Sequence, residues 1–345
     1  MFPVPGSRYL IGHIPWYSAL IVLGACIAVW MAVREEKRLN LKKDTIIDLT
    51  LWLLPFGIVG ARIYYVFFSW DQFASDPLSV FYIWEGGIAI YGAVIAGLIV
   101  ILVFCRIRHQ SVLTLCDLIA PGLALAQSIG RWGNYFNMEA YGPEITNPSL
   151  CFFPFAVLIR HDTGFTWHMA AFFYESLADA LIFLFLIVAR RKWLRKTGDV
   201  FFFYAFLYGS ARLVIEELRT DSLYSSSLRI SQVLAFLICL SVLIYYFIKR
   251  KKAVSWSRRI VSVICFVSSV LFSVFVFSAI THTGPVFLPS SLKIRLIFLS
   301  SFSLLMILSL FVIYGPSDST EVLYANHTDQ KPAVSPSTSD GSGAG

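Results

Sequence analysis

Charged residues are scarce in this sequence: Asp, Glu, Lys and Arg together make up 14% of it, and 57% of the residues are hydrophobic. A soluble globular domain carries about a quarter charged residues and roughly 45–50% apolar ones. The mean hydropathy of +0.70 deviates in the same direction. The composition therefore excludes an ordinary soluble domain and indicates a membrane protein.

Cysteine patterns typical of metal sites are also missing. No two of the six cysteines form a CxxC pair, and all but Cys151 lie within or at the edge of apolar stretches. We expect them to be small buried apolar residues rather than disulfide partners or metal ligands. The six are Cys26, Cys105, Cys116, Cys151, Cys239 and Cys265.

A net charge of +7 could suggest nucleic acid as a partner. The Lys and Arg residues, however, occur in short runs between apolar stretches. Membrane proteins use such runs to set their orientation and to contact anionic lipid head groups. We therefore expect membrane lipids, and not nucleic acid, as partners.

Several apolar stretches are long enough to cross a bilayer, which takes about 20 residues of helix. The sequence predicts an all-α polytopic membrane protein with spans near 10–33, 46–70, 87–105, 112–129, 169–189, 199–218, 229–248, 260–281 and 294–314. The tail, 315–345, is polar and rich in Ser, Gly, Pro and Asp, and is predicted to be disordered.

The basic residues between the spans predict their orientation. Eighteen of the 28 Lys and Arg residues follow the first, third, fifth and seventh spans, whereas segment 71–86 has none. Because basic loops stay in the cytoplasm, the N-terminus is predicted to lie outside. Segment 130–168 is then an external loop. Lys293 and Arg295 fall on the outer side, so the last two spans follow this rule less well.

Ionisable residues within the predicted spans are costly in lipid and often mark functional sites, the alternative being hydrogen bonding between helices. They are Arg62, Asp117, Glu175, Asp179, Arg212 and Glu216. Most of them fall in the outer half of their spans, as do Tyr17 and Tyr91 at the starts of inward-running spans. This convergence favours a site near the outer face.

One face of the sixth span carries Tyr208, Arg212, Glu216 and Arg219, at spacings that repeat with the helix. An ion pair between Arg and Glu within the helix is the simpler interpretation. Two arginines against one glutamate nevertheless leave positive charge, and the planar fork of an arginine matches phosphate oxygens. The face is therefore a candidate anion site.

Segment 130–142 reads GRWGNYFNMEAYG and follows the fourth span. Its glycines permit a tight turn or a close backbone approach. Arg131 supplies positive charge, Asn134 and Asn137 supply amides, and Glu139 supplies a carboxylate. So many polar groups where a helix leaves the membrane indicate function.

This segment resembles the signature of the bacterial prolipoprotein diacylglyceryl transferases. Other motifs of that family agree in order, at Trp16-Tyr17, Gly60-Ala61-Arg62 with Tyr64-Tyr65, Trp84-Glu85-Gly86-Gly87-Ile88, Phe173-Tyr174-Glu175-Ser176, and Tyr208-Gly209 through Arg212, Glu216 and Arg219. The similarity covers about residues 10–250. The resemblance therefore implies a seven-span core, 1–250, followed by an extension, 251–314, with two further spans.

Two positions depart from the family pattern. Tyr91 stands where the family often has the histidine of a His-Gly-Gly start, and His168-Met169 replaces a His-Pro pair. The family histidine has been proposed as catalytic, so its replacement leaves the general base open.

The resemblance implies transfer of the diacylglyceryl group of phosphatidylglycerol to the lipobox cysteine of a preprolipoprotein signal peptide, with glycerol phosphate leaving. It implies a bacterial cell membrane location and no cofactor or metal. The implied catalytic residues are Tyr91, Arg131, Glu139, Arg212 and Glu216. The implied lipid-binding residues are Arg131, Asn134, Arg212, Arg62, Tyr17 and Gly142.

In this scheme Arg131 and Arg212 hold the leaving phosphate, with Arg62 or Arg219 as support. The base is Tyr91, Glu139 or Glu216; because a phenol is mostly protonated at neutral pH, a hydrogen-bonding role is the expectation for the tyrosine.

Every motif ends before residue 250, so the extension is expected to be dispensable for the chemistry. A transporter or channel would also use intramembrane charges, but no repeated halves are visible and the charges gather at one face. A structural scaffold would leave the signature unexplained.

Overall fold

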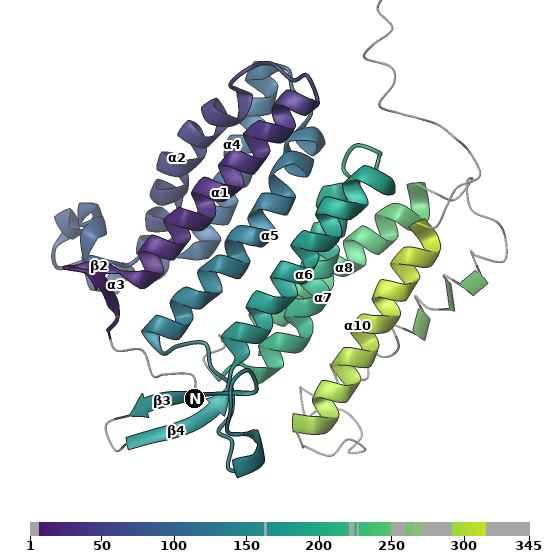
Figure 1. Cartoon of the computed structure of the whole chain (residues 1–345). Helices are drawn as coiled ribbons and strands as arrows, with labels where there is room; N and C mark the ends of the chain where they lie inside the picture. Colours follow the sequence, from purple (N-terminus) through teal and green to yellow (C-terminus); the bar gives the residue numbers. More distant parts are fainter. Residues whose placement is uncertain are drawn as a thin grey trace, which may run out of the picture.

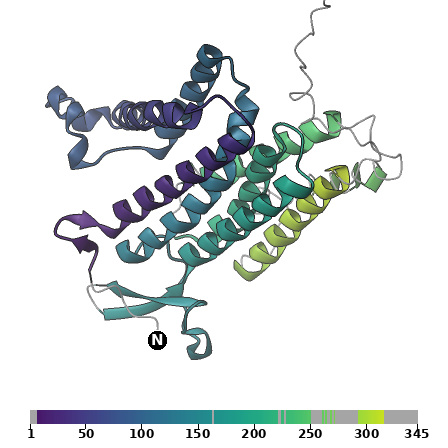
Figure 2. The same ribbon diagram turned by 45° about the horizontal axis from the view of Figure 1, so that its top comes forward.

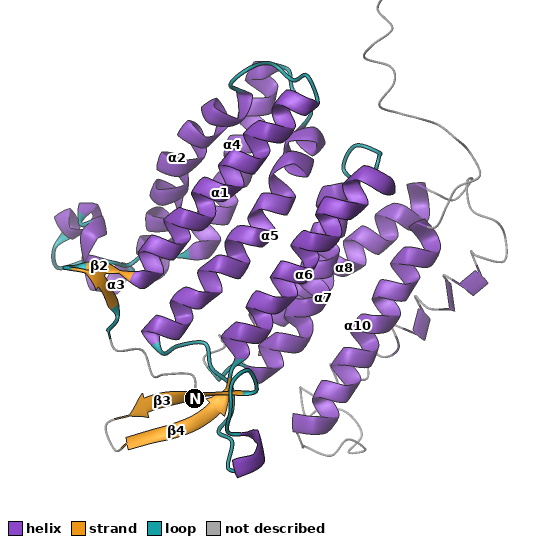
Figure 3. Ribbon diagram, in the orientation of Figure 1, coloured by secondary structure: helices purple, strands orange, loops and turns teal. Residues whose placement is uncertain are grey.

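The protein is a bundle of long helices with a β-hairpin at one end (Figure 1, Figure 3). The computed structural model describes residues 7–161, 164–220, 224–225, 228–249 and 292–314, with residues 260, 261, 263, 264, 267, 268 and 271. Among these residues, seven helices are long and apolar enough to cross a membrane. The prediction of a helical multi-pass membrane protein is confirmed.

The long helices follow the predicted spans in order. They are α1 (Trp16–Arg38), α2 (Thr45–Phe68), α4 (Ile90–Arg108), α5 (Val112–Asn137), α6 (Ala171–Lys192), α7 (Asp199–Leu218), α8 (Ile230–Lys249) and α10 (Leu292–Tyr314). Seven of these eight helices provide the apolar spans. Helix α7 does not, because four of its 20 residues are charged. The predicted span at 260–281 lies mostly, and the tail 315–345 entirely, outside the described residues.

The first and fourth predicted spans differ most from the structure. Helix α1 begins six residues late, because β1 (Tyr9–Ile11) and β2 (Ile14–Pro15) form a short hairpin before it. Helix α5 continues eight residues past its predicted end, through polar residues that the sequence analysis assigned to a loop. Packing sustains this last part, since Gly133 and Asn134 are buried. The helix ends at Asn137, and the next residue, Met138, adopts a left-handed conformation with φ 53°.

The two ends of the bundle differ in charge. Lys and Arg runs follow α1, α4 and α6 at one end, where α8 also ends at Lys249, and we call this the basic end. The other end, which we call the hairpin end, carries β3 (Ala156–His161) and β4 (Gly164–Met169), paired antiparallel (Figure 1). The described residues also form minor elements: α3 (Trp70–Phe73), η1 (Pro77–Phe81), η2 (Ile83–Glu85), η3 (Pro148–Leu150), β5 (Tyr224–Ser225) and β6 (Leu228–Arg229).

The β3–β4 hairpin lies within the segment predicted to be an external loop. It packs through Val157 and Ile159 against Tyr135 of α5 and Phe172 of α6, in one buried apolar cluster. The segment is therefore an ordered cap on two helices, joined to the end of the signature.

Small residues let the helices approach closely. A β-carbon at Gly122 of α5 would lie 2.9 Å from Cα of Ala28 in α1, and one at Gly92 of α4 would lie 2.3 Å from the carbonyl oxygen of Gly60 in α2. Such contacts are typical of membrane helices, where van der Waals packing replaces the hydrophobic drive. The α2–α4 pair is set apart from the layer formed by α5, α6, α7 and α10 (Figure 2).

Asp117, which the sequence analysis named among the intramembrane charges, lies near the basic end. Its carboxylate accepts hydrogen bonds from the backbone N–H groups of Gly198 at 2.6 Å and Phe201 at 2.8 Å. It thereby satisfies free donors at the N-terminus of α7.

Candidate active site

A buried network of arginines and carboxylates joins α5, α6 and α7 near the hairpin end. Its centre is Glu175 of α6, whose residue surface is 2% exposed. One carboxylate oxygen, Oε1, contacts Nη2 of Arg131 from α5 and Nη1 of Arg212 from α7, each at 2.6 Å. Nη1 of Arg219 lies 3.8 Å from the other oxygen, Oε2. Three arginines, one from α5 and two from α7 and its C-terminal cap, therefore direct positive charge at one carboxylate.

The network also contains the ion pair expected from spacing along α7. Nη2 of Arg212 lies 2.7 Å from Oε2 of Glu216, one helical turn away. The guanidinium groups of Arg131, Arg212 and Arg219 thus lie around two carboxylates, those of Glu175 and Glu216. Positive charge in a mostly dry site favours an anion, and phosphate matches the arginine fork.

Asp179 lies one helical turn beyond Glu175 on α6 and is 1% exposed. Its Oδ2 atom has no hydrogen-bond partner among the residues described. It continues the polar surface of α6 toward the bundle interior, where Tyr204 of α7 donates to Gln127 of α5 at 2.7 Å.

The amides of the signature bind its own carboxylate. Nδ2 of Asn134 donates to Oε1 of Glu139 at 2.9 Å, and Nδ2 of Asn137 donates to the same oxygen at 3.1 Å. Arg8 donates in turn to Oδ1 of Asn137 at 3.0 Å, which fixes the orientation of that amide. Glu139 is exposed at the hairpin end, in contrast to buried Glu175.

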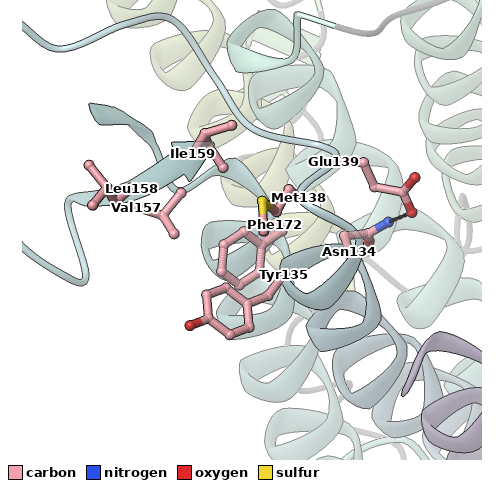
Figure 4. Close-up of a pocket in the computed structure, with 8 residues that line it drawn as sticks. All are labelled: Asn134, Tyr135, Met138, Glu139, Val157, Leu158, Ile159 and Phe172. Atoms are coloured by element: carbon pink, nitrogen blue, oxygen red, sulfur yellow. Dashed lines mark hydrogen bonds between the residues drawn. The ribbon is translucent and has the colours of Figure 1, made fainter. Parts of the chain in front are cut away.

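A narrow crevice lies between this end of α5 and strand β3 (Figure 4). The bonded pair of Asn134 and Glu139 forms its polar side, and Phe172 and the hairpin residues Val157 and Ile159 contribute apolar side chains. The signature thus connects the charged network to the hairpin.

Gly142 and Tyr17 both lie in close packing contacts: the backbone of α7 approaches Gly142, and the Tyr17 ring approaches Gly133. A β-carbon at Gly142 would lie 2.9 Å from the carbonyl oxygen of Leu218, the last residue of α7. A β-carbon at Gly133 would lie 2.5 Å from Cδ2 of Tyr17. Tyr17 therefore packs directly on the signature helix, two residues from Arg131.

Arg62 and Tyr91 belong to the α2–α4 pair. The Arg62 guanidinium donates to five backbone carbonyl groups between Ser79 and Gly87, the shortest contact being 2.6 Å to Gly86. The Tyr91 ring lies 6.3 Å, centroid to centroid, from the ring of Tyr64. In the part of the chain that the structure describes, no ion pair or hydrogen bond links either residue to the Glu175 network.

The network brings Arg131, Arg212, Glu216 and Arg219 together around Glu175, a residue outside the predicted catalytic set. The sequence did contain a signal for Glu175, because it belongs to the Tyr174-Glu175 element of the family motif. Spacing along one chain segment cannot reveal which helix faces a given carboxylate.

A family model described as "Prolipoprotein diacylglyceryl transferase" matches residues 9–248. The chain belongs to this family. It is 43% identical over 246 residues to the phosphatidylglycerol–prolipoprotein diacylglyceryl transferase of Limosilactobacillus reuteri, covering 70% of this chain and 90% of the relative. It is 42% identical over 239 residues to that of Streptococcus mutans, covering 69% and 92%.

The resemblance inferred from the motifs is thereby confirmed, and the chain is an enzyme, a transferase of lipoprotein biosynthesis. The family match ends at residue 248, so it includes α1 through nearly all of α8 and stops before α10. It covers every residue predicted for the site.

Proposed function

We propose that this transferase moves the diacylglyceryl group of phosphatidylglycerol to the cysteine thiol of a preprolipoprotein. The thiolate sulfur attacks the terminal glycerol carbon that carries the phosphate ester oxygen, and the carbon–oxygen bond breaks. The electron pair stays on that oxygen, so glycerol phosphate leaves and a thioether remains. The thiol proton goes to a general base. The proposal rests on one observation in a chain of this family: Arg131 and Arg212 both form ion pairs with Glu175.

The two arginines act on the phosphate. Negative charge grows on the ester oxygen as the bond breaks, and preorganised guanidinium donors stabilise that charge more in the transition state than in the ground state. Glu175 holds both forks in place before the lipid arrives. Arg219, 3.8 Å from the same carboxylate, adds positive charge.

Of the two candidate carboxylate bases, we favour Glu139. Glu216 is 1% exposed and paired with Arg212, whereas Glu139 is exposed at the hairpin end. A thiol, with an ordinary pKa near 8.5, needs only modest help to ionise. Tyr91 contributes a hydrogen bond to a substrate, and Asn134, Tyr17 and Gly142 shape the lipid site.

Arg62 contributes to the lipid site indirectly. Its donors are directed at loop carbonyl groups, so we assign it to ordering the loop between α2 and α4. That loop leads directly into α4, which contains Tyr91.

The hairpin end faces the outside of the cell membrane in this proposal. The Lys and Arg runs at the basic end support it, because such runs stay in the cytoplasm. Phosphatidylglycerol of the outer leaflet and the exported cysteine would then meet at the same level.

The test is incubation of the purified protein with phosphatidylglycerol labelled in its acyl chains and a peptide that contains a lipobox cysteine. We expect label on the peptide and release of glycerol phosphate. A peptide with Cys→Ser serves as the matched control and should remain unlabelled. Intact, folded protein that transfers no label to the cysteine peptide would exclude the proposed reaction.

A further inference from the structure

Helix α10 lies beyond the family match and packs along α7 and α8 (Figure 1). One face of it is buried in the same apolar cluster as α6, α7 and α8. The buried apolar residues of that face are Leu299, Phe302, Met306, Leu310 and Ile313, spaced three or four residues apart. The helix is therefore part of the bundle and not a separate module.

Polar bonds fix α10 against α7 at two heights. Midway along the helix, Oγ of Ser303 donates to the carbonyl oxygen of Ser210 at 3.1 Å, and both residues are buried. At the basic end, the Tyr314 hydroxyl lies 2.5 Å from Oδ2 of Asp199 and 2.9 Å from the carbonyl oxygen of Trp193. We call these contacts the α10 clamp.

Polar contacts of this kind can fix the register of a helix against its neighbour, which apolar packing in a membrane does not do alone. Lipid tails can replace an apolar helix face at little cost, so apolar area alone would not fix α10 in register. Lipid tails cannot donate a hydrogen bond to a buried carboxylate or to a backbone carbonyl oxygen, so they cannot replace the polar contacts of α10. Asp199 is 2% exposed, and α7 is the long helix too charged to count among the apolar spans.

The clamp acts close to the site along α7. Ser210 precedes Arg212 by two residues, which is about 3 Å along the axis. A shift of α7 at Ser210 would therefore move the guanidinium that contacts Glu175 by a similar amount. Displacements of about 1 Å in a catalytic constellation can cost about a hundredfold in rate.

We infer that α10 is a positioning element of the transferase, which holds α7 so that Arg212 meets the lipid phosphate. The inference rests on the proposed function. It modifies the expectation that the extension is dispensable: all the predicted site residues remain without it, but one of them loses a support.

The experiment compares full-length protein with Ser303→Ala/Tyr314→Phe. Ser301→Ala/Tyr245→Phe is the matched control, because the Ser301 hydroxyl bonds its own helix at Ile297 and Tyr245 contacts Lys249 of α8. We expect kcat/KM for phosphatidylglycerol to fall about tenfold in the clamp variant and to stay within about twofold in the control. Ser303→Thr keeps the hydroxyl donor and should retain activity where Ser303→Ala loses it.

A second comparison separates positioning from general destabilisation. The clamp variant is combined with Arg212→Lys and, separately, with Glu139→Gln, which lies outside α7. If the clamp acts through Arg212, its tenfold effect should shrink to less than about threefold with Arg212→Lys and persist with Glu139→Gln.

Equal losses in both backgrounds, or full activity in the clamp variant, would overturn the inference. A full-length protein that transfers no label fails the proposed function instead, before any variant is compared. A stop after Lys252 that matches full-length kcat/KM would also refute a positioning role for α10.

Discussion

Glu175→Gln is the substitution that tests the network most directly. Both arginine nitrogens lie 2.6 Å from the same oxygen, so they can be no more than twice that distance apart. Two unit charges about 5 Å apart repel by about 3 kcal/mol at an effective dielectric constant of about 20. The carboxylate offsets this repulsion, and the neutral amide cannot.

We therefore expect Glu175→Gln to separate the two guanidinium groups and to reduce kcat/KM about a hundredfold, since about 1.4 kcal/mol corresponds to a tenfold change. Initial rates of label transfer measure the loss, and thermal unfolding shows whether the variant is folded. Glu217→Gln is the matched control, because Glu217 is also a buried carboxylate but lies on α7 and pairs with Arg229 at 3.2 Å.

Two results would contradict this reasoning. More than about a third of the wild-type activity in Glu175→Gln would mean that the forks stay in place without the carboxylate. A lower KM for the lipid at unchanged kcat would mean that Glu175 competes with phosphate for the arginines instead of positioning them.

Three further substitutions test the remaining roles. Arg131→Lys keeps the charge but loses the fork, so transfer should fall at least about tenfold at normal expression, and near-normal turnover would reduce Arg131 to a point charge. Tyr91→Phe should cost about 0.5–1.5 kcal/mol, roughly tenfold at most, with an unchanged pH profile between pH 6 and 10; a loss beyond about a hundredfold with an altered profile would make it the base. Glu139→Gln should lower kcat by about a hundredfold or more if it is the base, and raising the pH should recover part of the loss as the thiol ionises unaided; a loss that pH does not change would leave Glu139 as a bonding partner of Asn134.

The sequence predicted the long helices well because each depends on a run of apolar residues that lipid itself selects. It predicted the end of α5 poorly. Five of the eight residues from Gly130 to Asn137 are Gly, Arg or Asn, which are unfavourable or polar in a spanning helix, and contacts with other segments, such as Tyr17 on Gly133, support the helix there. Those contacts are not encoded in the local pattern.

The charged site was predicted in part for a similar reason. The pairing of Arg212 with Glu216 follows from a spacing of four residues, and the structure confirms it at 2.7 Å. The convergence of Arg131 and Arg212 on Glu175 depends instead on how α5, α6 and α7 are rotated about their axes. Arg62 shows the converse, since its position in a span resembled a site residue while its donors are directed at the carbonyls of a nearby loop.

The contacts of Asp117 and Glu175 constrain the number of residues in α7 between the two points at which they bind it. The helix is fastened to α5 near one end by the bonds from Gly198 and Phe201 to Asp117, and near the other through Arg212 and Arg131 on a shared carboxylate. One residue inserted between Phe201 and Arg212 would rotate everything beyond it by about 100° and advance it by about 1.5 Å. The residue count of this stretch is therefore constrained, because gaining or losing a residue would turn Arg212 away from Glu175.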